Sequence, residues 1–250
     1  MHFTTAIRSQ TGAREENQDA ADHFETEGLS GWALADGLGG HRGGGLAASL
    51  ATDVLLRTCR EHDQVAPATL RAATDAAQNT LQERQRQHFE YSQMRTTAVL
   101  LLADAESETA LWSHVGDSRL YHFREGAVAA QTTDHSAAQA MVDAGDLAPD
   151  AVRYHESRHR LTRALGDSGR SKPDIAESRV PLRAGDAFLL CSDGFWEGLT
   201  ETEMIAELEN TSGPDEWLDA MQSRIEEANG EPHDNYTAVA MLVNGLSDAP

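Results

Sequence analysis

Apolar positions along the first ninety residues change from a strand-like run to helix-like spacing. The run GWALA at 31–35 predicts a short strand that ends at Asp36. From about 43 to 62, apolar residues recur every fourth position, which predicts a helix. A second helix is expected from about 68 to 88, with apolar residues on one face and polar residues on the other. We therefore expect a strand, an acidic loop and two helices in this order.

After residue 95 the pattern changes to short apolar runs separated by turn residues. These runs continue to about 131 and predict successive antiparallel strands. Further elements are expected as a helix at 136–145, a strand at 186–191, helices near 201–210 and 215–228, and a strand at 236–243. A layered α+β fold with sheets inside and helices outside would bury every apolar face. Nothing marks a linker, so a single domain over residues 1–250 is expected.

Charge and composition exclude several classes of partner. The chain has 41 acidic and 20 basic residues, and its net charge of −21 would repel nucleic acid and anionic membranes. No segment approaches about 18 consecutive apolar residues, and the polar N-terminus does not resemble a signal peptide. Cys59 and Cys191 lie outside any CxxC spacing and predict neither a disulfide framework nor a zinc site. We therefore expect a soluble cytoplasmic protein.

Four aspartates lie where strand patterns end. Asp36 and Asp193 precede glycines, Asp117 follows a glycine, and Asp234 precedes an asparagine. Taken singly, such pairs most often form ordinary turns. Together, carboxylates that converge without lysines nearby would repel one another unless cations neutralised them. Ligand sets made only of oxygen favour hard cations such as Mg²⁺ or Mn²⁺.

Seven short motifs together resemble a known family. They are RxxNQDA at 14–20, ADGLGGH at 35–41, VGDSRLY at 115–121, DHS at 134–136, LTRALG at 161–166, CSDGFWE at 191–197 and DNYTAV at 234–239. In this order and spacing they resemble the metal-dependent protein phosphatases, the PPM or type 2C family, over about residues 8–243. The resemblance implies a four-layer α-β-β-α sandwich, in which two antiparallel sheets lie between layers of helices and a metal cluster lies at one edge.

The resemblance also implies a metal core of two Mn²⁺ or Mg²⁺ ions. Asp36 would bridge the two ions, and Asp193 and Asp234 would complete the ligand shell of one of them. The other ion would take the backbone carbonyl of Gly37 and several waters. Paired ions about 3.5–4 Å apart lower the pKa of a bound water and so supply hydroxide near neutral pH.

Two further aspartates have peripheral roles by this resemblance. Asp117 resembles the ligand of a third cation that it would share with Asp193, and its alternative role is to cap a tight turn. Asp19 would hold a metal-bound water. It ranks above Gln18, which stands where some relatives have glutamate.

The implied reaction is in-line attack of the metal-bridging hydroxide on the phosphorus of phosphoserine or phosphothreonine, without a covalent phosphoenzyme. Arg14 is the candidate for binding the phosphate, because a guanidinium pairs bidentately with phosphate oxygens. Its alternative role is a surface salt bridge. Eukaryotic relatives have a histidine after the Asp-Gly pair, but this chain has Leu38, so the proton donor is unassigned. His41 is a candidate for catalysis, directly or through water, and its alternative is an ordinary surface role.

The stretch from 145 to 165 resembles the family's flap, a variable loop beside the cleft. Arg158 and Arg160 belong to its basic cluster, which could hold acidic residues of a phosphopeptide substrate. Alternatively, these arginines simply balance an acidic surface. No metal-binding role is expected for the other histidines, which include His114, His135, His155 and His159.

The leading interpretation is a hydrolase, a monomeric serine/threonine protein phosphatase that acts on phosphorylated proteins and opposes a cognate Ser/Thr kinase. Two alternatives stay open. A phosphatase of an anti-sigma-factor antagonist shares the fold but usually follows sensor domains. A non-catalytic phospho-sensor of the same fold would normally have lost metal ligands, and the expected aspartates are all present.

Overall fold

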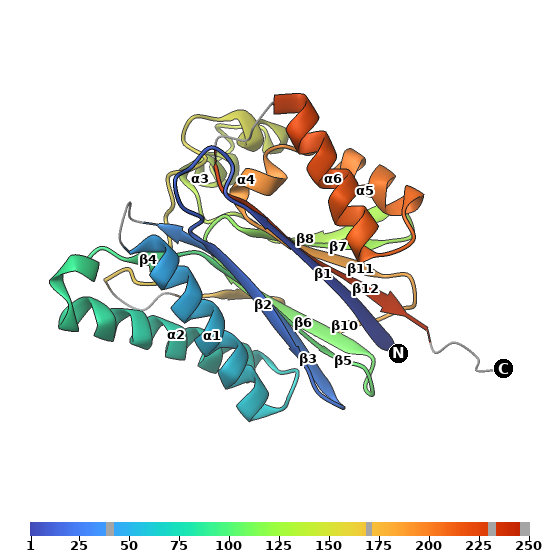
Figure 1. Cartoon of the computed structure of the whole chain (residues 1–250), viewed down its shortest axis with the longest axis horizontal. Helices are drawn as coiled ribbons and strands as arrows, with labels where there is room; N and C mark the ends of the chain where they lie inside the picture. The colour runs from blue at the N-terminus through green and yellow to red at the C-terminus, as the bar shows by residue number, and fades with distance from the viewer. Residues whose placement is uncertain (39–42, 169–171, 230–233, 246–250) are drawn as a thin grey trace.

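The computed structural model describes residues 1–38, 43–168, 172–229 and 234–245. Its strands form two antiparallel sheets (Figure 1). The five-stranded sheet has the order β1 (His2–Gln10), β12 (Tyr236–Asn244), β11 (Ala187–Cys191), β7 (Arg119–Arg124) and β8 (Ala127–Gln131). The seven-stranded sheet has the order β10 (Val180–Pro181), β6 (Thr109–Val115), β5 (Ala98–Asp104), β3 (Leu29–Leu38) and β2 (Asp19–Glu25). Two short strands complete it: β4 (Arg95–Thr96) pairs with β3, and β9 (Asp174–Ile175) pairs with β6.

Helices cover the outer faces of both sheets. On the seven-stranded side lie α1 (Gly44–His62) and α2 (Pro67–Gln87), and on the five-stranded side lie α5 (Glu201–Asn210) and α6 (Pro214–Asn229) (Figure 1). The short elements are η1 (Phe89–Tyr91), α3 (Ala137–Asp143), η2 (Pro149–Tyr154) and α4 (Asp193–Trp196). Buried apolar side chains such as Trp32 and Phe188 fill the space between the sheets. The predicted four-layer sandwich is therefore confirmed.

The boundaries of the helices follow local chemistry. Pro67 occupies the first turn of α2, where its missing N–H is not needed. Thr200 and Glu203 form a capping box at the start of α5, because each side chain accepts from the backbone N–H of the other residue. Since these signals and the apolar periodicity are local, α1, α2, α5 and α6 all lie within two residues of their predicted positions.

The N-terminal strands were not predicted from the sequence. Strand β1 has a single fully buried residue, Ala6, so its apolar pattern is weak. It is held instead by pairing along its whole length with β12, from the far end of the chain, as Figure 1 shows. The predicted end of a strand at Asp36 is wrong, because β3 continues to Leu38 and its last two residues pair with β4. Asp36 therefore lies within a strand rather than in a loop.

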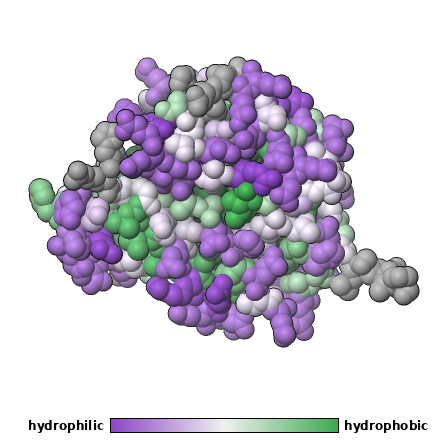
Figure 2. All heavy atoms as spheres, in the orientation of Figure 1, coloured by the Kyte–Doolittle hydropathy of each residue, from purple (hydrophilic) through white to green (hydrophobic). Residues whose placement is uncertain are grey.

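Hydrophilic residues dominate the surface on the face drawn in Figure 2, with only small hydrophobic patches between them. This distribution agrees with the large acidic excess of the chain. In the part of the chain that the structure describes, no helix combines the length and the apolar character needed to cross a membrane.

Candidate active site

Asp19 and Asp36 lie directly opposite each other on neighbouring antiparallel strands. Strand β2 pairs with β3 so that the two residues are register partners. Like charges in this arrangement destabilise strand pairing, so the pair needs compensation from outside the sheet. The hydroxyl of Ser192 donates to Oδ2 of Asp19 at 2.8 Å, but Oδ1 is buried and has no hydrogen-bond partner among the described residues.

The backbone of Asp36 is held by two consecutive threonines. Its carbonyl oxygen accepts from the N–H of Thr97 at 2.9 Å and from the hydroxyl of Thr96 at 2.7 Å. Its own N–H donates to the hydroxyl of Thr97 at 2.9 Å. The next residue, Gly37, packs against Gly44 at the start of α1, and a Cβ at position 37 would lie 2.2 Å from the carbonyl group of Gly44. Only glycine therefore fits at position 37.

A second close backbone approach brings Asp193 and Asp234 together. Asp193 follows β11 and Asp234 precedes β12, which pairs with β11. A Cβ on Gly194 would lie 2.1 Å from the carbonyl oxygen of Asn235 and 3.4 Å from the Cβ of Asp234. The side-chain oxygen of Asn235 accepts from the N–H of Gln18 at 2.9 Å. The motifs near residues 18, 193 and 234 thus meet in one place.

Asp117 lies in the connection between β6 and β7, where the chain crosses from one sheet to the other. Its side chain is buried, and its carbonyl oxygen accepts from the indole N–H of Trp196 at 2.9 Å. The preceding Gly116 has a φ of +105°, and a Cβ there would lie 2.7 Å from a side-chain carbon of Thr97. The turn at Gly116 therefore brings Asp117 close to the threonines that hold Asp36.

Electrostatic repulsion couples the five aspartates, which we call the carboxyl cluster. Burial is the largest cause that raises the pKa of Asp36 and Asp117 well above the usual carboxyl range, and it raises the pKa of Asp19 to about 6. The negative charge of Asp193 adds to the rise in all three cases, and Asp234 adds to it for Asp19 and Asp36. Bound cations would remove this repulsion. The unpartnered Oδ1 of Asp19 and the set of oxygen-only donors fit a hard divalent cation.

Arg14 and His41 are the two predicted catalytic residues that are not aspartates, and the structure describes only Arg14. Nη2 of Arg14 donates to Oδ2 of Asp234 at 2.7 Å, while 58% of the Arg14 side chain stays exposed. The guanidinium thus lies at the edge of the carboxyl cluster and is accessible to solvent. His41 lies outside the described residues.

Sequence reasoning missed His159, which the flap brings to the cluster. Its Nδ1 lies 3.2 Å from Oδ2 of Asp193 and 3.7 Å from Oε1 of Glu197. The hydrogen bond with Asp193 raises the pKa of His159 above its usual value. No spacing in the sequence signals this contact, because it arises only when the flap folds beside α4.

The two flap arginines differ in their partners. Nε of Arg158 donates to Oε1 of Glu197 at 2.7 Å, so its charge is paired. Arg160 is exposed, and its side chain has no partner among the described residues. Only Arg160 of this pair is therefore available as it stands to meet a substrate.

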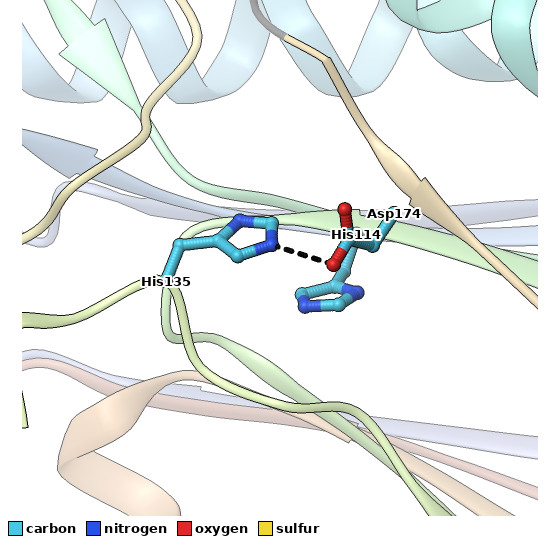
Figure 3. Close-up of side chains that lie close together, drawn as sticks. All are labelled: His114, His135 and Asp174. Carbon is cyan, nitrogen blue, oxygen red and sulfur yellow. Dashed lines mark ion pairs between the residues drawn. The ribbon is translucent and has the colours of Figure 1, made fainter. Parts of the chain in front are cut away.

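A second titratable cluster is formed by His114 on β6, His135 before α3 and Asp174 on β9 (Figure 3). Nε2 of His135 lies 3.2 Å from Oδ2 of Asp174, and the two imidazole rings stack with centroids 4.6 Å apart. Nη1 of Arg163 donates to Oδ1 of Asp174 at 2.7 Å and lies 3.2 Å from Nε2 of His135. The guanidinium of Arg163 therefore occupies the position that a metal cation would take between His135 and Asp174. Because Nδ1 of His135 accepts from the N–H of Gly116 at 3.1 Å, the cluster supports the turn that carries Asp117.

Comparison with known proteins agrees with this site. The model of the family described as protein phosphatase 2C matches residues 8–233. The serine/threonine phosphatase Stp of Listeria monocytogenes is 30% identical over 234 residues, which are 90% of each chain. The protein phosphatase PhpP of Streptococcus pneumoniae is 30% identical over 201 residues, 76% of this chain and 78% of the relative. The chain therefore belongs to the protein phosphatase 2C family.

Solved structures share the whole fold. The serine/threonine phosphatase PstP of Mycobacterium tuberculosis superposes with a TM-score of 0.80 at 27% identity, covering 97% of this chain and 99% of that one. A structure of the PstP catalytic domain in complex with two manganese ions gives a TM-score of 0.81 with the same identity and coverage. The predicted enzyme class, a serine/threonine protein phosphatase, is confirmed by the family and these relatives. The predicted dependence on Mn²⁺ or Mg²⁺ agrees with the manganese ions of that neighbour.

Proposed function

We propose that the carboxyl cluster binds two Mn²⁺ or Mg²⁺ ions and that the site hydrolyses phosphoserine and phosphothreonine in proteins. Asp36, Asp193 and Asp234 would be the side-chain ligands, and Gly37 would contribute its carbonyl oxygen. The observation that carries the proposal is the convergence of five carboxyl groups, of which Asp19, Asp36 and Asp117 have pKa values raised by burial and by neighbouring carboxylates. Arg14 alone cannot balance that charge.

Two aspartates have supporting roles in the proposal. Asp117 would share a third ion with Asp193, because the charge of Asp193 is the largest cause after burial that raises the pKa of Asp117. Asp19 would hold a water of the metal shell through Oδ1, the oxygen that lacks a hydrogen-bond partner. Ser192 keeps the other oxygen of Asp19 in place.

In the proposed reaction, the cations and the protein side chains have different tasks. When bound, the divalent cations supply an acidified water as the nucleophile and neutralise charge on the phosphate oxygens. Arg14 binds the phosphate by donating from its exposed guanidinium and orients the phosphorus for in-line attack. To do so Arg14 must leave Asp234, whose Oδ2 accepts a hydrogen bond from Nη2. The leaving serine or threonine oxygen needs a proton, for which we propose His41, because Leu38 cannot supply one.

The flap contributes to substrate binding in this proposal. Arg160, whose side chain is exposed and unpaired among the described residues, would meet an acidic residue of the substrate. Arg158 would act after it leaves Glu197, or would position the flap through that pair.

The proposal also covers the context of the enzyme. Both sheets contribute to the cluster, because Asp19 and Asp36 lie on one sheet and Asp193 and Asp234 adjoin strands of the other. This arrangement supports a single catalytic domain. Buried free Cys59 and Cys191 are compatible with a reducing cytoplasm. We expect a monomer that reverses the action of a Ser/Thr kinase on shared phosphoprotein substrates.

Phosphate release from a phosphothreonine peptide tests the function. The wild type should be active with Mn²⁺ and inactive in EDTA, and Asp36→Asn should lose at least about a hundredfold in kcat/KM, the scale expected when a cation site is disrupted. Asp22→Asn is the matched control, because Asp22 is an exposed aspartate on the same strand as Asp19. A thermal shift on adding Mn²⁺ gives a second readout, which Asp36→Asn should remove. Activity that survives in EDTA or in Asp36→Asn would contradict the proposal.

A further inference from the structure

A cavity of about 640 Å³ lies beneath η2 of the flap, between the end of β8 and the start of α5. Residues of its wall include Arg119, Thr132, Asp134, Asp150, Arg153 and Tyr154. None of the five aspartates of the carboxyl cluster lines it. The cavity is therefore separate from the carboxyl cluster, and none of its lining residues has a role in the proposed phosphatase reaction.

The inner wall of the cavity is tied to the carboxyl cluster through Trp196. Arg119 donates to both carboxylate oxygens of Asp134 at 2.8 Å, and its guanidinium carbon lies 3.4 Å from the centroid of the Trp196 ring. The indole N–H of Trp196 donates to the carbonyl oxygen of Asp117. An occupant of the cavity would thus lie close behind the residues that carry the cluster.

Arg153 in the cavity wall has an unsatisfied donor. Its side chain is only 9% exposed, and Nη2 donates to Oε1 of Glu201 at 2.7 Å. Nη1 is buried and has no hydrogen-bond partner among the described residues. A buried donor without an acceptor is costly. Because Nη1 is closed to solvent even beside the open cavity, this donor is not available to an occupant of the cavity.

The rim of the cavity favours a basic side chain. Arg119 and Arg153 are neutralised by Asp134 and Glu201, but Asp150 is exposed and has no partner among the described residues, so its negative charge remains. Tyr154 is 74% exposed, one of two large hydrophobic side chains that the described surface leaves so open. An aromatic face beside a carboxylate suits a lysine or arginine, whose cation is attracted by both.

The neighbouring backbone favours a peptide over a small molecule. Strand β8 is the outer strand of its sheet and ends at Gln131, which also lines the cavity. An outer strand offers unpaired backbone groups to an extended peptide. The flap that supplies η2 continues to His159, which contacts Asp193. A peptide with its phosphate at the cluster could therefore follow the flap towards the cavity.

We propose that this cavity binds a lysine or arginine of the phosphoprotein substrate, a few residues from the phosphorylated side chain. The inference rests on the proposed function and names a sequence preference for it. The basic residue would contact Asp150 and Tyr154.

Phosphothreonine peptides that differ only at flanking positions test the proposal. Peptides carrying lysine there should have a kcat/KM about tenfold higher than peptides carrying alanine, through a lower KM, with glutamate peptides the poorest. Asp150→Asn and Tyr154→Ala should each reduce this preference at least threefold. Asp146 is exposed, lies between α3 and η2 and does not line the cavity, so Asp146→Asn should keep the preference for lysine. Both pocket changes are at exposed positions, so folding should survive.

Binding of the dephosphorylated peptides in EDTA separates this inference from the proposed function. Fluorescence polarisation should show tighter binding of the lysine peptide, and Asp150→Asn should weaken that binding. If no peptide is hydrolysed but the binding preference holds, the proposed function fails and the pocket assignment stands. If peptides are hydrolysed without any lysine preference, or if the preference survives both pocket variants, the pocket assignment is overturned and the phosphatase function stands.

Discussion

The hydroxyl of Ser192 donates a 2.8 Å hydrogen bond to the carboxylate of Asp19, and this bond links the two sheets. Ser192 follows β11 of the five-stranded sheet, whereas Asp19 begins β2 of the seven-stranded sheet. The same hydroxyl accepts from the N–H of Thr237 at 2.9 Å. The carboxyl cluster therefore lies where the two sheets meet, and its charge state should influence the free energy of unfolding.

In the metal-free protein, the stability contributed by the carboxyl cluster should fall as pH rises. Because burial raises the pKa of Asp19 to about 6 and also raises those of Asp36 and Asp117, these three groups bind more protons in the folded protein than in the unfolded chain. This contribution is fully present below about pH 4, the usual carboxyl pKa, and is lost as pH rises through 6. We expect the contribution of Asp19 to the unfolding free energy in EDTA to fall by on the order of 2 kcal/mol between pH 4.5 and 7, against an opposite contribution from His114, whose pKa burial lowers to about 4.

Urea unfolding at several pH values measures this effect. Adding Mn²⁺ should reduce the loss of unfolding free energy near pH 7, since a cation stabilises the ionised carboxylates. Asp19→Asn should reduce the slope in EDTA, which separates the cluster from the general charge of the surface. Identical slopes for wild type and Asp19→Asn would show that the cluster does not titrate in this way.

Gly194→Ala should disrupt the active site without a change in charge. Its Cβ would lie 2.1 Å from the carbonyl oxygen of Asn235, so the backbone that carries Asp193 and Asp234 must separate. We expect at least about a tenfold loss of Mn²⁺ affinity, by analogy with the cost of displacing groups that orient metal ligands. Gly28→Ala is the control, because nothing lies within 4 Å of a Cβ there. Calorimetric titration of Mn²⁺ compares the two, and equal affinities would contradict the close-approach argument.

Arg14→Ala should weaken phosphate recognition. The guanidinium can offer two parallel hydrogen bonds to a phosphate, so its loss should lower kcat/KM for a phosphothreonine peptide about tenfold or more. Arg14→Lys should restore little, because an ammonium lacks the planar fork. The control is Arg8→Ala, which removes an arginine that pairs with Asp215 and Asp219 on the surface. Steady-state kinetics in which both alanine variants behave alike would assign Arg14 to a salt bridge only.

Asp134→Asn should destabilise the fold by about 3 kcal/mol, because the buried Arg119 then keeps only the longer ion pair with Glu201, whose Oε1 lies 3.8 Å from Nη1. The side chains of the pair are 7% and 2% exposed, so water cannot replace the lost interaction. Asp53→Asn breaks an exposed pair with Arg57 on α1 and should change the unfolding free energy by less than about 0.5 kcal/mol. Chemical unfolding of both variants checks the difference, and similar small losses would mean that Arg119 is supported mainly by Glu201 and Trp196.

The parts of the fold predicted from the sequence are those with a strong local pattern. Helices α1 and α2 show four-residue apolar spacing, and β11 is a continuous apolar run. The aspartates could be selected because they follow or precede such runs and because seven motifs keep the order of a family. Strand β1 has no comparable pattern, since its position depends on hydrogen bonds to β12, more than 220 residues away.

The sequence by itself determined the long helices, the strongly apolar strands, the family and which five aspartates to select, because periodicity and short motifs are properties of neighbouring residues. Only the tertiary structure decided that Asp19 faces Asp36 across two strands, that His159 reaches Asp193, and that Arg153 keeps an unpaired donor in the wall of a cavity. Those relationships join segments that lie far apart in the chain. Their energies depend on burial and on distances that no local pattern encodes.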